Sequence, residues 1–418
     1  MLGRMIAVAP VVFALLAASP APKTPKPDAR EIHTSALVID THADTPQRFL
    51  DERFDVGTVT PVADGHMDLQ KIRAGNLGAE FFSIWVDPNH HTRYAHRALQ
   101  LIDAVYEQTR RHAAEMTMAF SAADILAARQ GPSKKLAVLM GVEGGHAIED
   151  DLGILRDFYR LGVRYMTLTW SNTNEWADSS GDIKDTKIAH HNGLTDFGKD
   201  VVREMNRLGM MVDISHVSDK TFFDALNVTR APVIASHSSA RALTNSPRNM
   251  TDEMLKAVAK NNGVVQVNFF SAFIDEGYRK AFNEQTPARN AALNALKAKL
   301  KDADPATQYR ERDRLQKEWS ARIPRPPLKS LIDHIDHIAK VAGEDHVGIG
   351  SDFDGVSSLP EGLDSVADLP KITDELAARG YSREQLHKIL GGNLLRVFKE
   401  CERVSEQLRA SAPDHASH

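Results

Sequence analysis

The chain has 418 residues, a formal net charge of −5, and a composition that is 42% hydrophobic and 26% charged, which is typical of an ordinary soluble globular protein. This charge, with no polybasic block, gives no electrostatic reason to expect binding to nucleic acid or to an anionic lipid surface. A chain of this length fits a single α/β barrel with insertions as well as two domains. The expected partner is a small molecule.

The first residues have the pattern of an export signal. Arg4 precedes an apolar stretch of about 14 residues, 5–18, which is followed by small residues and is too short to span a bilayer comfortably. We expect residues 1–21 to be a signal peptide that is cleaved, with an uncleaved anchor as the alternative. The proline-rich residues 22–30 are expected to form an extended linker, so that the folded part starts near Glu31.

Cysteine usage limits the options for an exported chain. The single cysteine, Cys401, excludes an intrachain disulfide and cannot begin a lipid-anchored mature N-terminus. Residues 401–418 form a polar C-terminal tail without a hydrophobic anchor signal. We expect a periplasmic or secreted protein with no stable membrane anchor.

Strand-like and helix-like segments alternate along residues 31–400. This order implies a parallel sheet, and the number of units favours a (β/α)8 TIM-like barrel, whose active sites lie at the carboxyl ends of the strands. The periodicity predicts helices over residues 97–116, 152–161, 197–208, 218–226 and 252–260, and strands over residues 136–142, 165–170, 211–214, 233–235 and 264–269.

Residues 271–330 interrupt this alternation. They are rich in Ala, Lys, Arg, Glu and Gln, with helical pattern around 290–301 and 308–322, and they end near a group of prolines. The simplest interpretation is a charged helical hairpin inserted between two barrel strands. A lid over the site, a homodimer contact and a merely solvated excursion all remain open.

Five apolar, strand-like runs each end on acidic or metal-binding side chains. These runs are residues 37–44, 137–143, 211–216, 233–237 and 347–352. A lone histidine at the end of a strand is usually a hydrogen-bonded or surface residue, so the recurrence of the pattern carries the argument. The candidate metal ligands are His42, Asp44, Glu143, His216 and His237.

The donor set predicts the type of metal. Three imidazoles and two carboxylates without a thiolate suit zinc, with manganese or iron as substitutes. Five ligands exceed the need of one tetrahedral ion, whereas two ions that share a carboxylate use them all. The other histidines lack this strand context and are interpreted as surface or packing residues: His90, His91, His190, His191, His334 and His337.

Four motifs resemble those of the membrane (renal) dipeptidase family of zinc peptidases. They are Val-Ile-Asp-Thr-His-Ala-Asp at 38–44, Gly-Val-Glu-Gly-Gly-His at 141–146, Ser-His-Ser-Ser-Ala at 236–240 and Gly-Ser-Asp-Phe-Asp-Gly at 350–355. Their order and spacing match from about residue 32 to residue 400, with the helical insertion as the main surplus. The resemblance implies a barrel-fold dipeptidase with two zinc ions per chain.

The resemblance also implies roles for individual residues. His42 and Asp44 would bind one ion, His216 and His237 the other, and Glu143 would bridge them. Asp352 would carry the proton between water and leaving amine. Arg248 would bind the terminal carboxylate of a dipeptide, with a loop-capping role and competition from Arg241 as the alternatives.

Trp170 departs from the mammalian members of this family, which have a histidine that steadies the oxyanion. An indole has one N–H donor and no acceptor, so Trp170 can donate to an oxyanion but cannot exchange a proton. Either Trp170 packs against substrate or barrel, or a loop residue substitutes for the histidine. The candidates for substitution are Asn172, Asn174, His190 and His191.

Three functions are therefore weighed. The first is an exported zinc dipeptidase, which includes cleavage before C-terminal D-residues. The second is a related amidohydrolase that acts on N-acyl amino acids or other small amides. The third is a non-catalytic barrel that binds metal or peptide, against which the intact ligand set and Asp352 argue.

Overall fold

A computed structural model describes residues 28–88, 93–131 and 134–411, so the expected signal peptide and most of the linker lie outside the described residues. Within them, eight parallel strands follow one another in the order β1-β2-β4-β5-β6-β7-β8-β9, and β3 pairs with β4 beside this path. The ring closes where Ala43 bridges Phe353 and Asp44 N donates to Phe353 O at 2.8 Å. The strands are β1 (Val38–Ala43), β2 (Leu77–Trp85), β3 (Met116–Met118), β4 (Leu136–Glu143), β5 (Val163–Thr167), β6 (Met211–Asp213), β7 (Ile234–Ala235), β8 (Val264–Val267) and β9 (Val347–Ile349).

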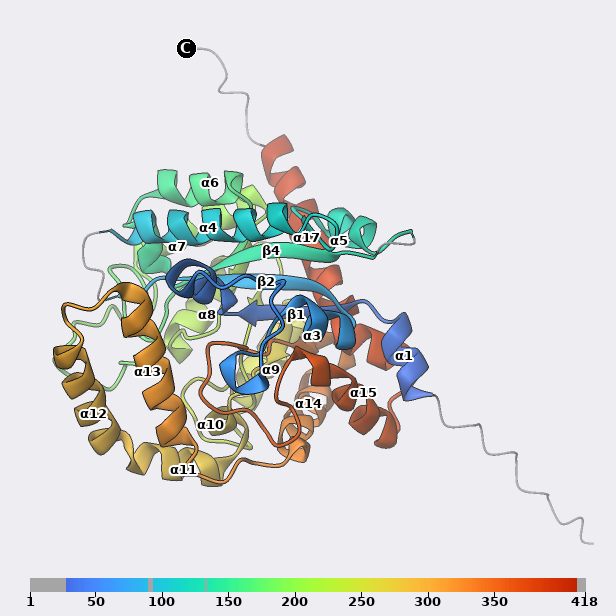
Figure 1. The fold of residues 1–418 in the computed structure, drawn as a ribbon. Coiled ribbons are helices and arrows are strands. Elements are labelled where there is room, and N and C mark those ends of the chain that lie inside the picture. Colours follow the sequence, from blue (N-terminus) through green and yellow to red (C-terminus); the bar gives the residue numbers. More distant parts are fainter. Residues whose placement is uncertain (1–27, 89–92, 132–133, 412–418) are drawn as a thin grey trace, which may run out of the picture.

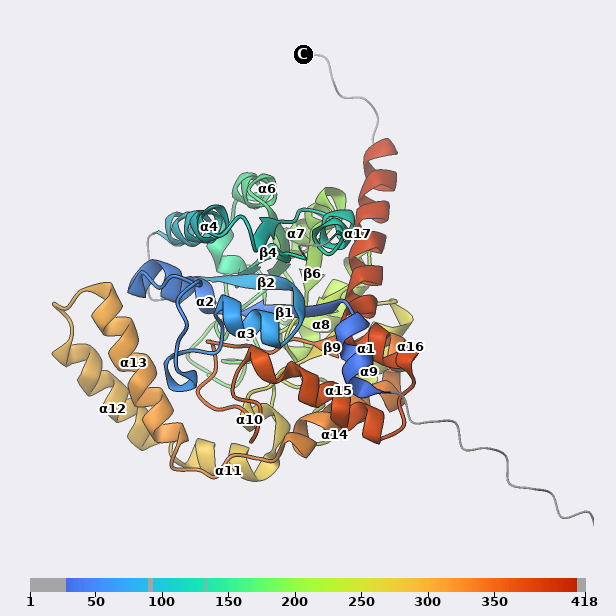
Figure 2. The same ribbon diagram turned by 45° about the vertical axis from the view of Figure 1, so that its right-hand side comes forward.

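Helices surround this barrel, so the predicted (β/α)8 TIM-like architecture is confirmed (Figures 1 and 2). The α-helices are α1 (Ala29–Ser35), α2 (Thr45–Gln47), α3 (Leu69–Ala74), α4 (Tyr94–Arg111), α5 (Ala122–Ala128), α6 (Leu152–Arg160), α7 (Asp196–Leu208), α8 (Asp219–Val228), α9 (Asp252–Lys260), α10 (Ser271–Ile274), α11 (Glu276–Glu284), α12 (Thr286–Lys299), α13 (Pro305–Ser320), α14 (Leu328–Ala342), α15 (Leu369–Ala378), α16 (Arg383–His387) and α17 (Asn393–Ala410). Short 3-10 and π turns complete them at Arg48–Glu52 (η1), Val62–Asp64 (η2), Gly145–Ile148 (η3), Glu344–His346 (η4), Val366–Asp368 (η5) and Lys388–Gly392 (η6).

The structure corrects two of the predicted segments and adds a strand that was not predicted. The helix expected over residues 97–116 ends at Arg111, and Met116 already belongs to β3. The strand expected over residues 165–170 is β5, which ends at Thr167 because the chain then leaves the sheet to form a loop at the barrel mouth. Strand β2 was not predicted, because the polar residues Glu80 and Ser83 interrupt its apolar run.

The barrel interior is closely packed beneath the mouth. Tyr165 of β5 is fully buried there, and its ring occupies the space next to Gly141, where a Cβ atom would collide with it. Phe81 of β2 packs against the same ring, at 5.7 Å between ring centroids. A glycine on β4 thus allows a large aromatic side chain to reach across the barrel toward β1.

The segment 271–330 contains four helices, α10 to α13. Helices α12 and α13 form an antiparallel hairpin at the edge of the barrel (yellow to orange in Figures 1 and 2), and α13 packs on η1. No residue of α12 is buried. A small cluster that includes Tyr278 and Ile323 anchors the base of the hairpin.

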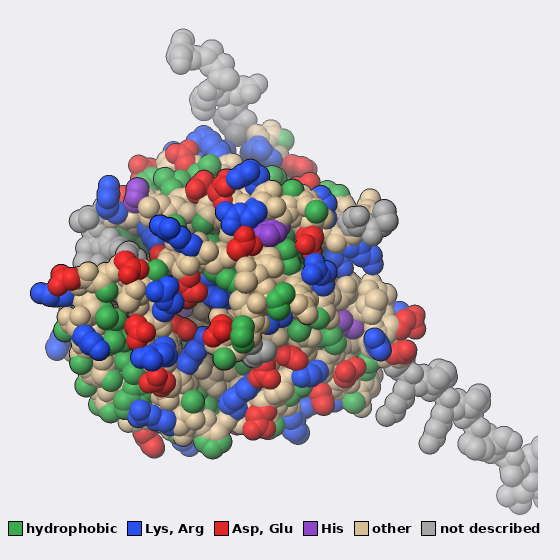
Figure 3. All heavy atoms as spheres, viewed as in Figure 1, with side chains coloured by type: hydrophobic (Ala, Val, Ile, Leu, Met, Phe, Trp, Pro, Cys, Tyr) green, Lys and Arg blue, Asp and Glu red, His purple; other side chains and the backbone are tan. Residues whose placement is uncertain are grey.

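The face of the molecule seen in Figure 3 shows no concentration of one charge. In Figure 3, basic and acidic side chains are interspersed over the visible face, in keeping with the net charge of −5. Among the described residues, none of the helices has both the length and the apolar character needed to cross a bilayer.

Candidate metal centre

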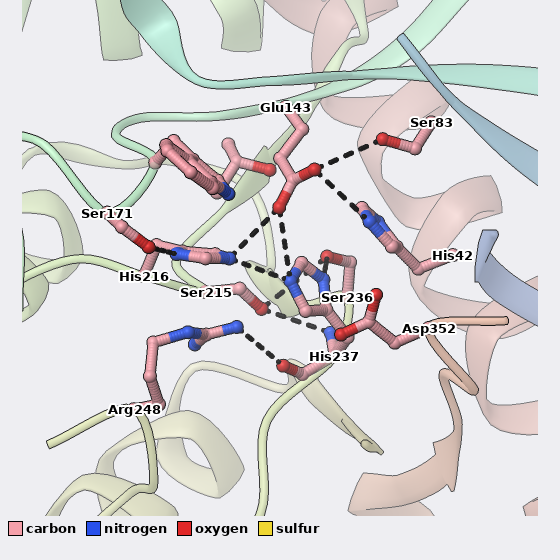
Figure 4. Close-up of polar contacts among 12 residues, drawn as sticks. His42, Ser83, Glu143, Ser171, Ser215, His216, Ser236, His237, Arg248 and Asp352 are labelled. Carbon is pink, nitrogen blue, oxygen red and sulfur yellow. Dashed lines mark hydrogen bonds and ion pairs between the residues drawn. The ribbon is translucent and has the colours of Figure 1, made fainter. Parts of the chain in front are cut away.

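The barrel brings the predicted ligands together at one end. His42 lies in β1 and Glu143 ends β4, while the remaining acids and imidazoles sit in the turns that directly follow their strands. Because parallel strands end at the same rim, residues far apart in sequence become neighbours there. The cluster, shown in part in Figure 4, comprises His42, Asp44, Glu143, His216, His237 and Asp352, each at most 9% exposed.

Glu143 lies between the imidazoles. Its Oε2 is 3.4 Å from His42 Nε2, and its Oε1 is 3.0 Å from His216 Nε2 and 3.4 Å from His237 Nε2 (Figure 4). On the other side of His42, Nε2 is 3.6 Å from Asp44 Oδ2. The two oxygens of one carboxylate therefore face different sets of imidazoles, which is the arrangement of a bridging ligand.

Two groups of ligand atoms are compact enough to surround an ion. His42, Glu143 and His237 form one, and His42, Asp44 and Asp352 form the other, with ligand atoms no more than 4.8 Å apart in each. His42 Nε2 is buried and has no hydrogen-bond partner. Buried polar atoms are normally satisfied, so a free imidazole nitrogen at this position is expected if it binds a metal ion. The donors present, imidazole and carboxylate, fit a borderline divalent ion such as zinc.

Hydrogen bonds hold the imidazoles of His42 and His237 with Nε2 turned toward the cluster. Tyr165 Oη donates to Thr41 O at 3.0 Å, so His42 Nδ1 must donate to that hydroxyl, 2.8 Å away. His237 Nδ1 lies 2.7 Å from Ser236 Oγ, which donates to Asp213 Oδ2 at 2.6 Å. A metal-binding histidine usually engages its second nitrogen in this way, which fixes the tautomer.

Two further polar groups position the carboxylates. Ser83 Oγ donates to Glu143 Oε2 at 3.2 Å, and Asn268 Nδ2 donates to Asp352 Oδ2 at 2.8 Å. Burial raises the pKa of Asp352 to about 7, and the charges of Asp44 and Glu143 add to the effect. For Glu143, the surrounding imidazoles outweigh burial and hold its pKa well below the usual value.

The backbone is strained at two members of the cluster. His216 and Asp352 adopt left-handed conformations, with φ of 66° and 64°, which residues other than glycine rarely adopt. Such strain persists only where surrounding contacts impose it, and it is common at functional sites. At Gly355, a Cβ atom would collide with both Asp44 and Asp352, so this glycine leaves room for the two carboxylates.

Arg248 is buried beside the cluster without an acidic partner. Among the described residues it forms no ion pair; Nη2 donates to His237 O at 3.2 Å, Nη1 to Ser238 Oγ at 3.5 Å, and Nε is buried without a partner. Its guanidinium lies 5.3 Å from the ring centroid of Phe273. Burial lowers its pKa to about 10. Arg241, the competing candidate, is occupied by a bidentate ion pair with Asp219.

Trp170 lies at the rim between aromatic rings. Its ring is 5.0 Å from that of Trp85, edge to face, and 6.2 Å from that of His216. Three of the loop residues considered as substitutes are engaged elsewhere. The side chain of Asn174 bonds Leu168 O, Trp176 N and Ala177 N, while His190 and His191 lie within hydrogen-bond distance of loop carbonyls.

The remaining histidines stay outside the cluster. His334 is fully buried against the backbone of Ala240 and Ile274, and His337 pairs with Asp252. His90 and His91 lie outside the described residues.

The supporting residues were not found from the sequence. Ser83, Tyr165, Asp213, Ser236 and Asn268 act on the cluster through hydrogen bonds to its members. Ser236 adjoins His237 and Asp213 ends a strand, so position alone was a signal for these two. Nothing local in the sequence distinguishes the others.

Comparisons with known proteins agree with this geometry. The family model for membrane dipeptidase (peptidase family M19) matches residues 27–412. Human dipeptidase 3 is 34% identical over 400 residues, which are 93% of this chain and 70% of that protein.

Solved structures share the fold. The probable dipeptidase PvdM of Pseudomonas aeruginosa superposes with a TM-score of 0.76 at 27% identity, covering 90% of this chain and 98% of that one. A metallopeptidase of Rhodobacter sphaeroides, liganded with a phosphinate mimic of L-Ala-D-Ala, gives a TM-score of 0.68 at 25% identity, covering 88% and 99%. The chain thus belongs to the membrane dipeptidase family, peptidase family M19, and is a metal-dependent hydrolase of the dipeptidase type.

Proposed function

We propose that this protein hydrolyses free dipeptides with two divalent ions, zinc in the first place, held by His42, Asp44, Glu143, His216 and His237. The position of Glu143 between two sets of imidazoles supports the pair of ions, with this carboxylate as their bridge. Ions bound there would lower the pKa of a bound water toward 7 and so supply hydroxide at neutral pH.

The observation that carries the choice of substrate is the buried Arg248. A guanidinium without an ion-paired carboxylate is costly to bury, and its planar fork of donors matches a carboxylate in two parallel hydrogen bonds. A ligand's carboxylate would remove that cost. Because Arg248 donates to His237 O, the terminal carboxylate bound there lies close to the ligand cluster, which suits a dipeptide better than a longer chain.

Asp352 is placed to carry the proton. The amide of Asn268 holds one of its oxygens beside the ligand cluster, where a carboxyl can accept a proton from water and return it. Asp352 would accept the proton of the attacking water and deliver it to the departing amine. Without that delivery, the tetrahedral intermediate would tend to expel the water again.

Trp170 is the side chain proposed to donate to the oxyanion. Asn174, His190 and His191 are engaged with the loop, so the donors that remain are the amide of Asn172 and the indole N–H of Trp170, whose ring lies beside that of His216. Removing one oxyanion donor costs about 10²- to 10³-fold in other enzymes, so Trp170→Phe measures this role directly.

We extend the proposal to stereochemistry and location. The structural relative bound to a mimic of L-Ala-D-Ala supports cleavage before C-terminal D-residues. The apolar stretch near the N-terminus supports export, with residues 1–21 removed, and N-terminal sequencing of the protein recovered outside the cytoplasm tests it.

Arg248→Gln tests the dipeptidase assignment. For free L-Ala-L-Ala, we expect kcat/KM of the zinc-loaded variant to fall about 10²-fold, the effect of losing two parallel hydrogen bonds to a charged group, mostly through KM. For the C-terminally amidated substrate, the change should be small, because no carboxylate is lost. Arg241→Gln, which removes a rim arginine already paired with Asp219, is the matched control.

Each outcome selects one function. Equal losses on the free and amidated substrates would show that Arg248 does not bind the carboxylate. Cleavage of N-acyl amino acids but not of dipeptides would identify the amidohydrolase alternative, since both substrates offer the same carboxylate. A metal-loaded protein that cleaves neither would indicate a binding role.

A further inference from the structure

A large cavity lies between the inserted hairpin and the barrel rim. Its volume is about 860 Å³, and its walls come from α12 and α13 on one side and from η1, α4 and the end of β2 on the other. Figure 1 shows the hairpin standing opposite α4 across this region. The insertion thus builds a compartment that the barrel alone does not have.

The cavity adjoins the ligand cluster. Trp85 lines it and is the register partner of Glu143, and Gln47 lines it three residues after Asp44. Tyr309 of α13 lines it as well, and burial raises its pKa well above the usual value, with the charges of Asp313, Asp354 and Asp44 adding to the effect. Helix α13 packs on η1, the turn that follows Asp44 and α2 in the chain.

The cavity and Arg248 lie on opposite sides of the barrel mouth. Arg248 follows β7, and Trp85 ends β2; in the closed ring these two strands are separated by four steps in either direction. A substrate whose terminal carboxylate is bound by Arg248, and whose scissile bond lies over the cluster, extends its N-terminal residue toward β2. The cavity is then the space for the N-terminal side chain.

The lining of the cavity is rich in hydrogen-bond donors and has an excess of positive charge. Its charged side chains, apart from one histidine, are four basic and two acidic. Arg97 pairs with Asp51 at 2.7 Å, whereas Arg312 touches Asp87 by a single contact of 3.3 Å. The four basic side chains are Arg93, Arg97, Lys297 and Arg312.

Arg312 is the best placed of these side chains. It is half-buried on α13, and its guanidinium lies 5.8 Å from the ring centroids of both Trp85 and Tyr309. The single contact with Asp87 leaves most of its five N–H donors for a ligand. An aromatic wall with a guanidinium above it suits the methylene groups and the carboxylate of an acidic side chain.

We propose that this cavity is a subsite for an anionic N-terminal side chain, so that the enzyme prefers dipeptides beginning with glutamate or aspartate, with Arg312 as the specificity-determining residue. The proposal rests on the proposed dipeptidase function, which it deepens by naming the substrate class. It also gives the helical insertion a role in substrate selection.

The test compares two substrates of equal size. L-Glu-L-Ala and L-Gln-L-Ala differ in the charge of the N-terminal side chain, and L-Ala-L-Ala reports dipeptidase activity as such. For the zinc-loaded protein we expect kcat/KM for the Glu substrate to exceed that for the Gln substrate about tenfold, the typical worth of a hydrogen bond to a charged group. The ratio should fall toward one in Arg312→Gln and should decline with added salt.

The ratio is independent of how much of a variant is folded, because both substrates report on the same active fraction. Arg314→Gln is the matched control: it removes the same charge from the same helix, but Arg314 pairs with Glu311 and does not line the cavity. Its ratio should equal that of the unmodified protein.

The outcomes separate the subsite from the dipeptidase function. If L-Ala-L-Ala is cleaved but the Glu substrate is not preferred, or if Arg312→Gln leaves the preference unchanged, the subsite proposal is wrong and the dipeptidase function stands. If none of the three dipeptides is cleaved, both proposals are overturned.

Discussion

Glu143 and a pair of interior carboxyl groups are all buried in the barrel, at different depths. At the mouth, Glu143 faces three imidazoles and keeps a pKa well below its usual value despite burial. One layer below, Asp40 and Glu80 are register partners on β1 and β2. Burial raises the pKa of Asp40 to about 6 and that of Glu80 well above its usual value.

The difference between the groups lies in their partners. Asp40 accepts from Ser351 N at 2.8 Å through one oxygen, while its other oxygen and both oxygens of Glu80 are buried without a hydrogen bond. Burying a carboxylate is costly unless a cation or donors compensate it. Glu143 has this compensation from three imidazoles, whereas Asp40 and Glu80 lack it, so charge is kept on Glu143 and is suppressed on the pair beneath it.

The largest effect is expected on metal affinity, when the carboxylate of Glu143 is removed from among the imidazoles. In Glu143→Gln, an amide replaces the carboxylate between the imidazoles, and its NH2 group faces nitrogens that should bind cations. We expect metal affinity to fall more than about 100-fold, beyond the effect of losing an outer partner, with a parallel loss of dipeptide cleavage. Metal content after dialysis measures it, and Glu175→Gln, at an exposed glutamate in the loop after β5, is the control. Unchanged metal content would refute the role of Glu143 as a ligand.

A smaller effect tests the support of the imidazoles. Ser236→Ala removes the hydroxyl that links His237 Nδ1 to Asp213, so the ring loses its fixed orientation and Asp213 loses a donor. We expect metal affinity to fall about 10- to 100-fold, measured by competition with a chromophoric chelator. Ser239→Ala serves as control, since that hydroxyl donates only to Asn268 O. Equal affinities in the two variants would contradict this role.

The smallest effect is expected at the interior pair, Asp40 and Glu80, where a substitution should stabilise the protein instead of impairing it. Glu80→Gln replaces an unpartnered carboxyl with an amide that has donors for the vacant oxygen of Asp40, so we expect the free energy of unfolding at pH 7 to increase by about 1–3 kcal/mol. Because the pKa of Glu80 is higher in the folded than in the unfolded protein, its carboxyl costs stability as pH rises above about 4.5.

The gain from Glu80→Gln should therefore shrink as pH falls toward 4. Urea unfolding of the metal-free protein across this pH range measures it, with the exposed Glu406→Gln on α17 as control. A gain that does not depend on pH would show that the charge of Glu80 is not its cause.

The sequence pattern was sufficient to predict most of the alternating strands and helices. It was also sufficient to predict the metal ligands at the ends of the strands. Helix α9 has the predicted bounds, and α7 and α8 differ from theirs by one or two residues. Strand β2 was missed, although it carries Ser83, which donates to Glu143, Glu80 of the barrel interior and Trp85 of the cavity. The equally buried β1 and β4 were found as apolar runs, whereas Glu80 and Ser83 interrupt the run in β2.

The choice between Arg248 and Arg241 shows where sequence reasoning ended. Both arginines follow β7 within a short distance, and their side chains are chemically identical. In the folded protein Arg241 pairs with Asp219 at the surface, while Arg248 turns inward and forms no ion pair among the described residues. Burial and the absence of a partner distinguish them, and neither is a property of the local sequence.

The sequence by itself determined the barrel, the family and the side chains that gather at its mouth, because apolar runs and the residues that end them are local patterns. The tertiary structure decided which imidazole each oxygen of Glu143 faces and how Tyr165 and Ser236 fix the imidazole rings. It also decided where the hairpin of residues 286–320 lies. These features depend on contacts between residues distant in the chain. Closure of the ring and the packing of α13 on η1 create those contacts, so they exist only in the folded protein.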